Sequence, residues 1–220
     1  MSYWDSLYSR GGNSGGGSVG AIRDWKWKTL SESGADMDRV IDFGCGDLSF
    51  WDGKGCSDYT GIEQSESRCR QNRVSRPDLP CFCADASYKQ LPDVLAQSPT
   101  VICFDVLFRV MDTKTYIGIL ENLSASSSDY IFIYTWWRNP FTNPIAFITA
   151  ILAQLHRGNY ENVSKMLETE NTPTDFQYQY YSPFCSYAKY LTHHKFQTVL
   201  YPPIDAVDPY GAMYIFRRRE

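Results

Sequence analysis

The residues with the clearest chemical pattern form the run Asp42-Phe43-Gly44-Cys45-Gly46, which ends a short apolar stretch. Glycine lets the backbone take positive φ or approach a ligand closely, so two glycines directly after a strand are typical of a turn that touches a bound molecule. Glu63 stands 21 residues beyond Asp42. A carboxylate at that spacing can accept hydrogen bonds from both hydroxyls of an adenosine ribose. The run therefore predicts a site for an adenosine-containing cofactor.

A nicotinamide dinucleotide is one candidate for that cofactor. The dinucleotide fingerprint has a third glycine, which allows close packing of helix and strand below the pyrophosphate. Position 49 in this chain is Ser49. We therefore expect a cofactor without a pyrophosphate, and we keep a nicotinamide-dependent oxidoreductase as the weaker alternative.

Strand-like and helix-like segments alternate along most of the chain, and this alternation is typical of an α/β fold. Apolar runs predict strands at Arg39–Phe43, Tyr59–Glu63, Cys81–Ala84, Ser98–Asp105, Asp129–Thr135, Phe196–Tyr201 and Ala212–Arg217. Helices are predicted at Asp47–Asp52, Ser65–Val74, Thr113–Ser124 and Pro183–His194. The short connection before the last strand contains Pro and Gly, so that strand should run antiparallel. We expect a Rossmann-like, seven-stranded, mostly parallel sheet with helices on both faces.

The alternation breaks after the fifth predicted strand. Residues 136–180 contain helical runs and the alternating aromatic segment Phe176–Tyr180, which together are too long for a simple connection. Aromatic residues make up 15% of the chain, and they are concentrated in and around this stretch. We expect a single domain over residues 1–220, with residues 136–180 inserted after the fifth strand as an aromatic substrate cap.

The pattern D-x-G-x-G with an acid after the second strand resembles the class I S-adenosylmethionine-dependent methyltransferases. A cysteine between the glycines is frequent in that family, and its cofactor has no pyrophosphate that would need a third glycine. An antiparallel last strand is typical of the family as well. The resemblance implies binding of S-adenosylmethionine (SAM), with S-adenosylhomocysteine (SAH) as the product.

The resemblance also implies where the cofactor is held. Asp85, at the end of the third strand, stands where such enzymes hold the adenine amino group. The segment Asp105–Asp112 looks like the one that underlies the cofactor and faces the methyl acceptor. The implied cofactor-binding residues are Trp4, Gly15, Ser18, Asp42, Gly44, Cys45, Gly46, Glu63, Gln64, Asp85, Ala86, Asp105, Val106 and Leu107.

Residues 1–30 contain the motif W-x-x-x-Y-x-x-G-G-x-S-G-x-G-S, which starts at Trp4 and ends at Ser18. A flexible tail or linker is one interpretation of a segment this rich in glycine. A similar stretch precedes the cofactor domain in a group of methyltransferases associated with glycan and peptide tailoring. Backbone amides of such a loop can form an anion-binding nest over the methionine carboxylate. We favour a lid that closes over the cofactor.

Three residues are candidates for positioning the methyl acceptor. Asp105 and Arg109 follow the fourth strand, and Arg138 follows the fifth, beside Trp136 and Trp137. Ligands of open α/β sheets bind outside the carboxyl ends of the strands, which is where these residues should lie. The family often has histidine at the position of Arg109, so no general base is evident. An arginine can instead hold an acidic acceptor through two hydrogen bonds.

These features favour O-methylation of a carboxylate or hydroxyl on a small molecule, a sugar or glycan, or a peptide. A fold that binds the cofactor without catalysis and serves as an interaction module is the alternative from another functional class. The 25 acidic and 21 basic residues provide no general attraction to nucleic acid. The oligomeric state stays open.

The chain has seven cysteines, an odd number, and it begins with a polar stretch that lacks the apolar core of a secretory signal. Both features favour a reducing, cytoplasmic setting. No C-x-x-C pair or histidine cluster completes a zinc site, so no metal is expected. The longest apolar stretch, Pro144–Leu155, is 12 residues long and too short to span a bilayer.

Overall fold

The computed structural model describes residues 3–88, 98–110, 112–138, 152, 155, 182–192, 196–201, 208 and 210–219. The predicted insertion at 136–180 lies outside this part of the chain, except for residues 136–138, 152 and 155.

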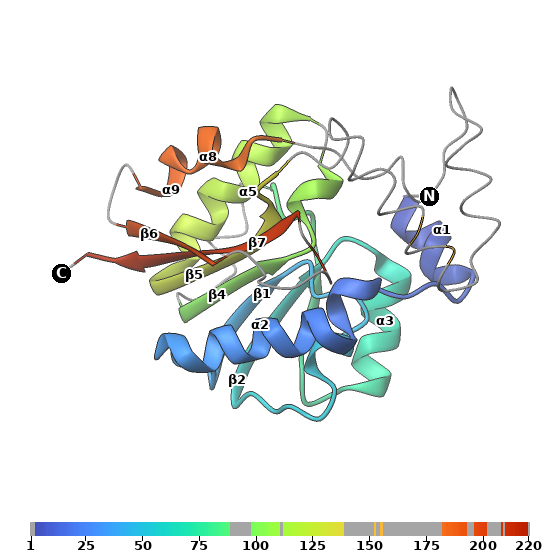
Figure 1. The fold of residues 1–220 in the computed structure, drawn as a ribbon. Coiled ribbons are helices and arrows are strands. Elements are labelled where there is room, and N and C mark those ends of the chain that lie inside the picture. Colours follow the sequence, from blue (N-terminus) through green and yellow to red (C-terminus); the bar gives the residue numbers. More distant parts are fainter. Residues whose placement is uncertain are drawn as a thin grey trace, which may run out of the picture.

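Seven strands of the described residues form one sheet in the order β3-β2-β1-β4-β5-β7-β6 (Figure 1). Strands β1 to β5 pair in parallel, whereas β7 runs antiparallel to both β5 and β6. The predicted α/β fold class is therefore confirmed, including the antiparallel last strand. The strands are β1 Arg39–Phe43, β2 Asp58–Glu63, β3 Cys81–Cys83, β4 Ser98–Phe104, β5 Ser127–Trp136, β6 Phe196–Tyr201 and β7 Gly211–Arg218.

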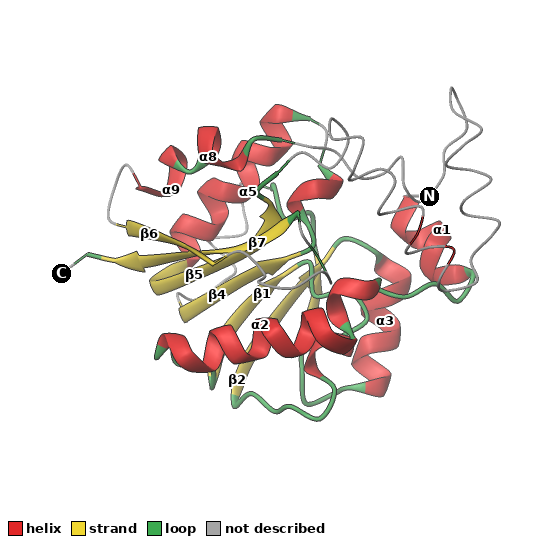
Figure 2. Ribbon diagram, viewed as in Figure 1, coloured by secondary structure: helices red, strands yellow, loops and turns green. Residues whose placement is uncertain are grey.

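Helices cover both faces of the sheet (Figure 2). On one face, Leu30 of α2 and Cys69 of α3 join a buried cluster with β4 residues such as Ile102. On the other face, α5, α8 and α9 pack against the alternate residues of the same strands. Strand β4 is buried along its whole length, as expected for a parallel strand with helices on both faces. The helices are α2 Gly20–Ser33, α3 Glu66–Ser75, α5 Thr113–Ser126, α8 Phe184–Tyr187 and α9 Lys189–Thr192.

The predicted helix at Asp47–Asp52 is wrong. Only Ser49–Trp51 are helical, as a single 3-10 turn. The preceding residue, Leu48, has a φ of 62°, in the left-handed region, so an α-helix cannot run through it. The predicted helix at Pro183–His194 is divided into α8 and α9.

Two N-terminal helices, α1 (Tyr3–Ser9) and α2, were not predicted from the sequence. Helix α1 lies beside α3 at one end of the sheet (Figure 1). Helix α2 begins at Gly20 and ends before Gly34, whose φ of 77° provides the left-handed turn common after a helix. Apolar residues at helical spacing, Ile22, Trp25 and Leu30, were the available signal for α2.

Asp42, in strand β1, is buried in the cluster beneath α2, with 5% of its surface exposed. Its Oδ2 accepts hydrogen bonds from Trp51 Nε1 at 2.8 Å and from Tyr59 Oη at 3.0 Å. Burial raises the pKa of Asp42 to about 6, although both donors oppose that shift. This carboxylate therefore holds the 3-10 turn and β2 against β1 from inside the core.

Asp42→Asn should make stability less dependent on pH. A carboxyl whose folded-state pKa is raised contributes stability that is complete below its ordinary pKa and is lost as pH rises through about 6. Asparagine keeps one oxygen acceptor and never ionises. The free energy of unfolding of the variant should therefore increase relative to that of the wild type between pH 4 and 7, by at most about 3 kcal/mol. Urea unfolding across this range measures the difference.

Asp24→Asn is the matched control, because the Asp24 side chain is 76% exposed. Its stability relative to the wild type should stay constant over the same pH range. A constant difference for Asp42→Asn as well would contradict the role of burial at Asp42.

Candidate functional site

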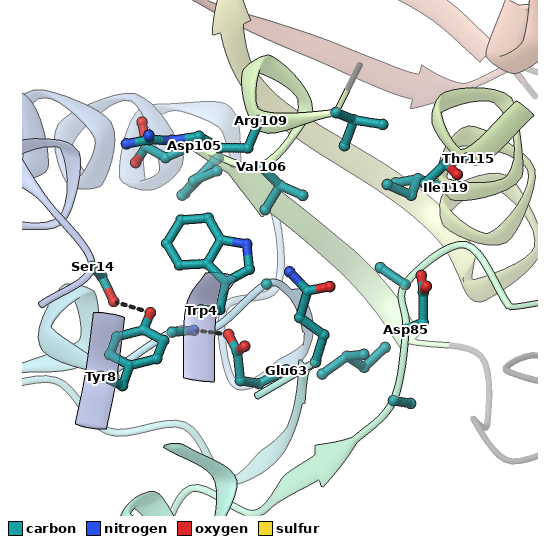
Figure 3. Close-up of a pocket in the computed structure, with 18 of the residues that line it drawn as sticks. Trp4, Tyr8, Ser14, Glu63, Asp85, Asp105, Val106, Arg109, Thr115 and Ile119 are labelled. Atoms are coloured by element: carbon teal, nitrogen blue, oxygen red, sulfur yellow. Dashed lines mark hydrogen bonds between the residues drawn. The ribbon is translucent and has the colours of Figure 1, made fainter. Parts of the chain in front are cut away.

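A cavity of about 280 Å³ opens at the carboxyl ends of β1, β2, β3 and β4 (Figure 3). Parallel strands end at the same edge of the sheet, so the residues that follow them meet there. Glu63 ends β2, Asp85 follows β3, and Asp105 and Val106 follow β4. Trp4 and Tyr8 of α1 close another side of the cavity.

The glycine turn after β1 is held close to its neighbours. The amides of Gly44 and Cys45 both donate to the carbonyl of Ile62, at 2.8 and 3.1 Å. Gly46 has a φ of 54°, and a Cβ on it would overlap Ser14 Oγ. A side chain at position 46 is therefore disfavoured by the backbone conformation and would overlap Ser14 of the glycine-rich segment.

Glu63 lines the cavity, but only 5% of its surface is exposed. Its two carboxylate oxygens accept the amide of Gly46 at 3.1 Å and the amide of Ser65 at 2.8 Å. Burial raises the pKa of Glu63 to about 7, although these backbone donors oppose the shift. The carboxylate is thus fixed in orientation beside the glycine turn and titrates near neutral pH.

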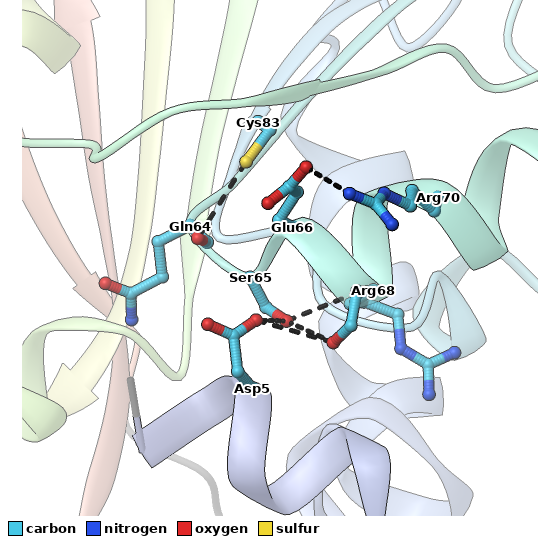
Figure 4. Close-up of polar contacts among 8 residues, drawn as sticks. Asp5, Gln64, Ser65, Glu66, Arg68, Arg70 and Cys83 are labelled. Atoms are coloured by element: carbon cyan, nitrogen blue, oxygen red, sulfur yellow. Dashed lines mark hydrogen bonds and ion pairs between the residues drawn. The ribbon is translucent and has the colours of Figure 1, made fainter. Parts of the chain in front are cut away.

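Helix α1 is bound to the start of α3 by side-chain hydrogen bonds (Figure 4). Asp5 Oδ1 accepts from Ser65 Oγ at 2.7 Å and from Ser67 Oγ at 3.4 Å. The guanidinium of Arg68 lies 4.5 Å from the centre of the Tyr8 ring. These contacts place the Trp4 and Tyr8 side chains at the cavity.

The glycine-rich segment is bound to the glycine turn by two reciprocal hydrogen bonds. The Ser14 amide donates to Asp47 Oδ2 at 2.9 Å, and the Asp47 amide donates to Ser14 Oγ at 2.7 Å. Ser14 Oγ also lies 3.3 Å from Tyr8 Oη (Figure 3). Residues 33 positions apart are thereby joined at the cavity wall.

No protein-family model and no curated protein matches this chain. A solved TehB-like SAM-dependent methyltransferase from Corynebacterium glutamicum is similar over 98% of this chain and 94% of its own, at 8% identity and a TM-score of 0.56. Magnesium protoporphyrin IX methyltransferase from Synechocystis, solved with bound SAH, is similar over 98% and 92%, at 15% identity and a TM-score of 0.55. The chain has the class I methyltransferase fold.

A third solved structure with a similar fold comes from Rhodobacter sphaeroides and carries the provisional name of a Zn-dependent alcohol dehydrogenase. It is similar over 100% of both chains, at 12% identity and a TM-score of 0.63. Among the described residues, no group of three or more His, Cys, Asp or Glu side chains is arranged to hold a metal ion. No helix in the described ranges is long and apolar enough to cross a membrane.

Most of the predicted site residues come together in this methyltransferase fold, although they are distant in sequence. The residues of that set that line the cavity are Trp4, Ser18, Gly44, Gly46, Glu63, Gln64, Asp85, Ala86, Asp105, Val106 and Arg109.

Five predicted residues do not line the cavity: Gly15, Asp42, Cys45, Leu107 and Arg138. Asp42 is turned into the core by its two donors, and Cys45 Sγ packs 3.5 Å from Cys81 Sγ. Leu107 is fully buried in the opposite cluster. The Arg138 guanidinium lies 3.9 Å from the centre of the Trp137 ring.

Several residues that line the cavity were not predicted from the sequence, among them Tyr8, Ser14 and Thr115, whereas Asp112 ends the predicted segment Asp105–Asp112. Asp112 caps α5 by accepting the Thr115 amide at 2.7 Å, a pairing that a D-x-x-T pattern signals. Tyr8 and Ser14 belong to the quoted N-terminal motif, but nothing in their types indicated which of its residues face a ligand. Lys26, which contacts Asp105, carried one signal, a charge within Trp25-Lys26-Trp27.

Gly46→Ala should destabilise the protein by more than its backbone strain alone. A left-handed conformation costs a non-glycine residue about 1–2 kcal/mol, and here the new Cβ must also displace Ser14. Gly53→Ala is the matched control, since Gly53 has a φ of 69° and the space that a new Cβ would occupy is open. Chemical unfolding should show a larger loss for Gly46→Ala, and Ser14→Gly in that background should recover part of it. Equal losses at both positions would contradict the close approach.

Proposed function

We propose that this chain is a SAM-dependent methyltransferase and that the cavity holds SAM. The observation that carries the proposal is the buried Glu63 carboxylate beside the glycine turn, with Asp85 one strand further along the same cavity. A carboxylate in this position can accept from the ribose hydroxyls, and Asp85 from the adenine amino group. Gly44 and Gly46 keep the turn free of side chains where the cofactor would lie.

The neighbourhood of the turn argues against a pyrophosphate. Dinucleotides place that group at the start of a helix, where free amides and the helix dipole favour negative charge. Here only a single 3-10 turn follows, and Asp47 occupies its start, with Oδ1 accepting the Ser49 amide at 3.0 Å. Because a fold by itself does not set the cofactor, the likeness to the Rhodobacter protein does not favour a nicotinamide.

We extend the proposal to the glycine-rich segment as a lid of the cofactor site, because a similar W-x-x-x-Y-x-x-G-G stretch precedes the cofactor domain in a group of methyltransferases. The reciprocal bonds of Ser14 and Asp47 support it, since they bring the segment to the cavity wall. Ser18 lines the cavity from the same segment.

We propose O-methylation of a carboxylate or hydroxyl on a small molecule, sugar or peptide, with residues 136–180 as the substrate cap. Bound SAM would supply a methyl group already activated on sulfonium. For a carboxylate acceptor the chain's own residues then need only orient the acceptor and exclude water, whereas a hydroxyl acceptor must also give its proton to a base. Arg109 lines the cavity, with its guanidinium 5.6 Å from the centre of the Trp4 ring. A cation beside an aromatic face suits an acidic acceptor.

We also propose that the protein works in the reducing cytoplasm. All seven cysteines are free thiols. Cys81 Sγ lies 3.5 Å from Cys45 Sγ and 3.4 Å from Cys69 Sγ, so three thiols pack in contact without a bond.

SAM and SAH should each bind and raise the melting temperature, whereas NADH should not. A ligand at a hundredfold excess over its Kd adds about 2.7 kcal/mol, which corresponds to a shift of a few degrees. Calorimetry and thermal denaturation measure both effects. Formation of SAH from SAM on adding cell extract or a sugar panel would distinguish an enzyme from a non-catalytic binding module. Absence of binding by either sulfur nucleotide would overturn the proposal.

Glu63→Ala locates the site. Loss of charge-assisted hydrogen bonds should weaken SAH binding by about tenfold or more. Wild-type affinity should rise as pH increases through about 7, because the ionised carboxylate is the form that accepts, and the variant should lack this rise. Glu66→Ala, three positions later with a side chain 67% exposed, should retain both properties. If the affinity of Glu63→Ala for SAH still rose as pH increased through about 7, the assignment of Glu63 to the cofactor site would be wrong.

Arg109→Ala should abolish SAH release in the presence of extract while leaving the affinity for SAH within about twofold. The reason is that the guanidinium faces the acceptor side of the cavity in this proposal. Arg138 follows β5 and does not line the cavity, and we propose that it holds the acceptor from outside it, so Arg138→Ala should show the same split. Arg39→Ala, at the start of β1 and at the opposite edge of the sheet, is the control and should affect neither quantity. If an Arg109 or Arg138 variant loses SAH binding, the division between cofactor and acceptor sides is wrong.

A further inference from the structure

Lys26 is a fully buried lysine, with 0% of its surface exposed, on the face of α2 that packs against the sheet. Burying an ammonium is costly unless other groups compensate it. Lys28, two positions later, has a side chain that is 72% exposed. The burial of Lys26 thus needs a specific reason, and its partners provide one.

Lys26 Nζ contacts three separate parts of the molecule. It donates to Asp105 Oδ2 at 2.5 Å and to the carbonyl of Gly17 at 2.8 Å. It also lies 4.1 Å from the centre of the Tyr134 ring, in cation–π geometry. One ammonium therefore joins an acid of the cavity, the glycine-rich segment and strand β5.

Asp105 is held firmly at this junction. It has a φ of 62°, which is rare for a residue other than glycine, and its amide donates to the Tyr134 carbonyl at 3.2 Å. A Cβ on Gly17 would overlap the Asp105 carboxylate, so the glycine-rich segment lies directly on that side chain. The carboxylate is thus enclosed between Gly17 and Lys26, where it lines the cavity (Figure 3).

We propose that Lys26 is a positioning residue of the methyl-transfer site. It fixes the Asp105 carboxylate at the cavity and holds Gly17, so that the segment Gly11–Gly20 stays closed over the cofactor. This inference rests on the proposed function. The bonds between Ser14 and Asp47 hold the segment at a second point, and Ser18, one residue after Gly17, lines the cavity.

Lys26→Met tests the hold of Lys26 on Gly17 without any ligand. Methionine has a similar length and leaves the Gly17 carbonyl without its donor. Hydrogen–deuterium exchange of the free protein should then become about tenfold faster at residues 11–20, while β4 and β5 exchange as in the wild type. Lys28→Met, the same substitution on the exposed face of α2, should leave exchange at residues 11–20 unchanged. Unchanged exchange at 11–20 in Lys26→Met, or faster exchange throughout, would overturn the proposal.

SAH affinity tests the contact of Lys26 with Asp105. Lys26→Met should weaken SAH binding by about tenfold in the wild type, but by only about threefold in an Asp105→Asn background, where the contact with Gly17 is all that remains to be lost. A merely structural role would give equal losses in both backgrounds, and that result would overturn the proposal. Should Lys26→Met alone fail to fold, the Lys26→Met/Asp105→Asn double variant, which buries no unpaired charge, must show faster exchange at residues 11–20 than Asp105→Asn, which keeps the Lys26 donor to Gly17.

The two hypotheses fail differently. If the wild type binds neither SAM nor SAH, the proposed function is wrong, and exchange at residues 11–20 still decides whether Lys26 holds the segment. If the wild type binds SAH and Lys26→Met matches it in affinity and in exchange, only the role of Lys26 is wrong.

Discussion

The parallel pairing of β1 to β5 is the constraint on which the rest of this structure depends. Parallel strands bring their carboxyl ends to one edge, so Glu63, Asp85 and Asp105 meet although each stands at the end of a different strand. The pairing also requires helices on both faces, which buries β4 completely. The cavity is therefore a consequence of strand order more than of any single residue.

Among the described residues, the acids Asp42 and Glu63 and the base Lys26 are buried at or below this edge, and each is compensated differently. Asp42 accepts hydrogen bonds from two side chains, and Glu63 accepts them from two backbone amides. Lys26 donates to a carboxylate and to a backbone carbonyl. Paired charges of this kind are weak contributors to stability, since desolvation offsets much of their attraction. Their value lies in orientation: they hold the glycine turn, the cavity acid and the N-terminal segment in fixed relation.

Strand positions were predictable because alternation of apolar runs and turns is a local property. β1 and β6 have the predicted bounds, and the remaining strands differ by a residue or two at their ends. The helix predicted after the glycine turn was wrong because the left-handed conformation of Leu48 depends on packing rather than on its type. Asp42 was assigned to the cavity because nothing local reveals that Trp51 and Tyr59 bind it from inside the core.

The sequence by itself determined the order of strands and turns, the glycine turn and the acid after β2, because each depends on residues close together in the chain. Tertiary structure decided which side chains face the cavity. Ser14 meets Asp47 across 33 positions, and Lys26 meets Asp105 across 79. Such pairs form only when the order of the strands within the sheet brings distant segments to one edge. No pattern of neighbouring residues shows which distant residues will meet there.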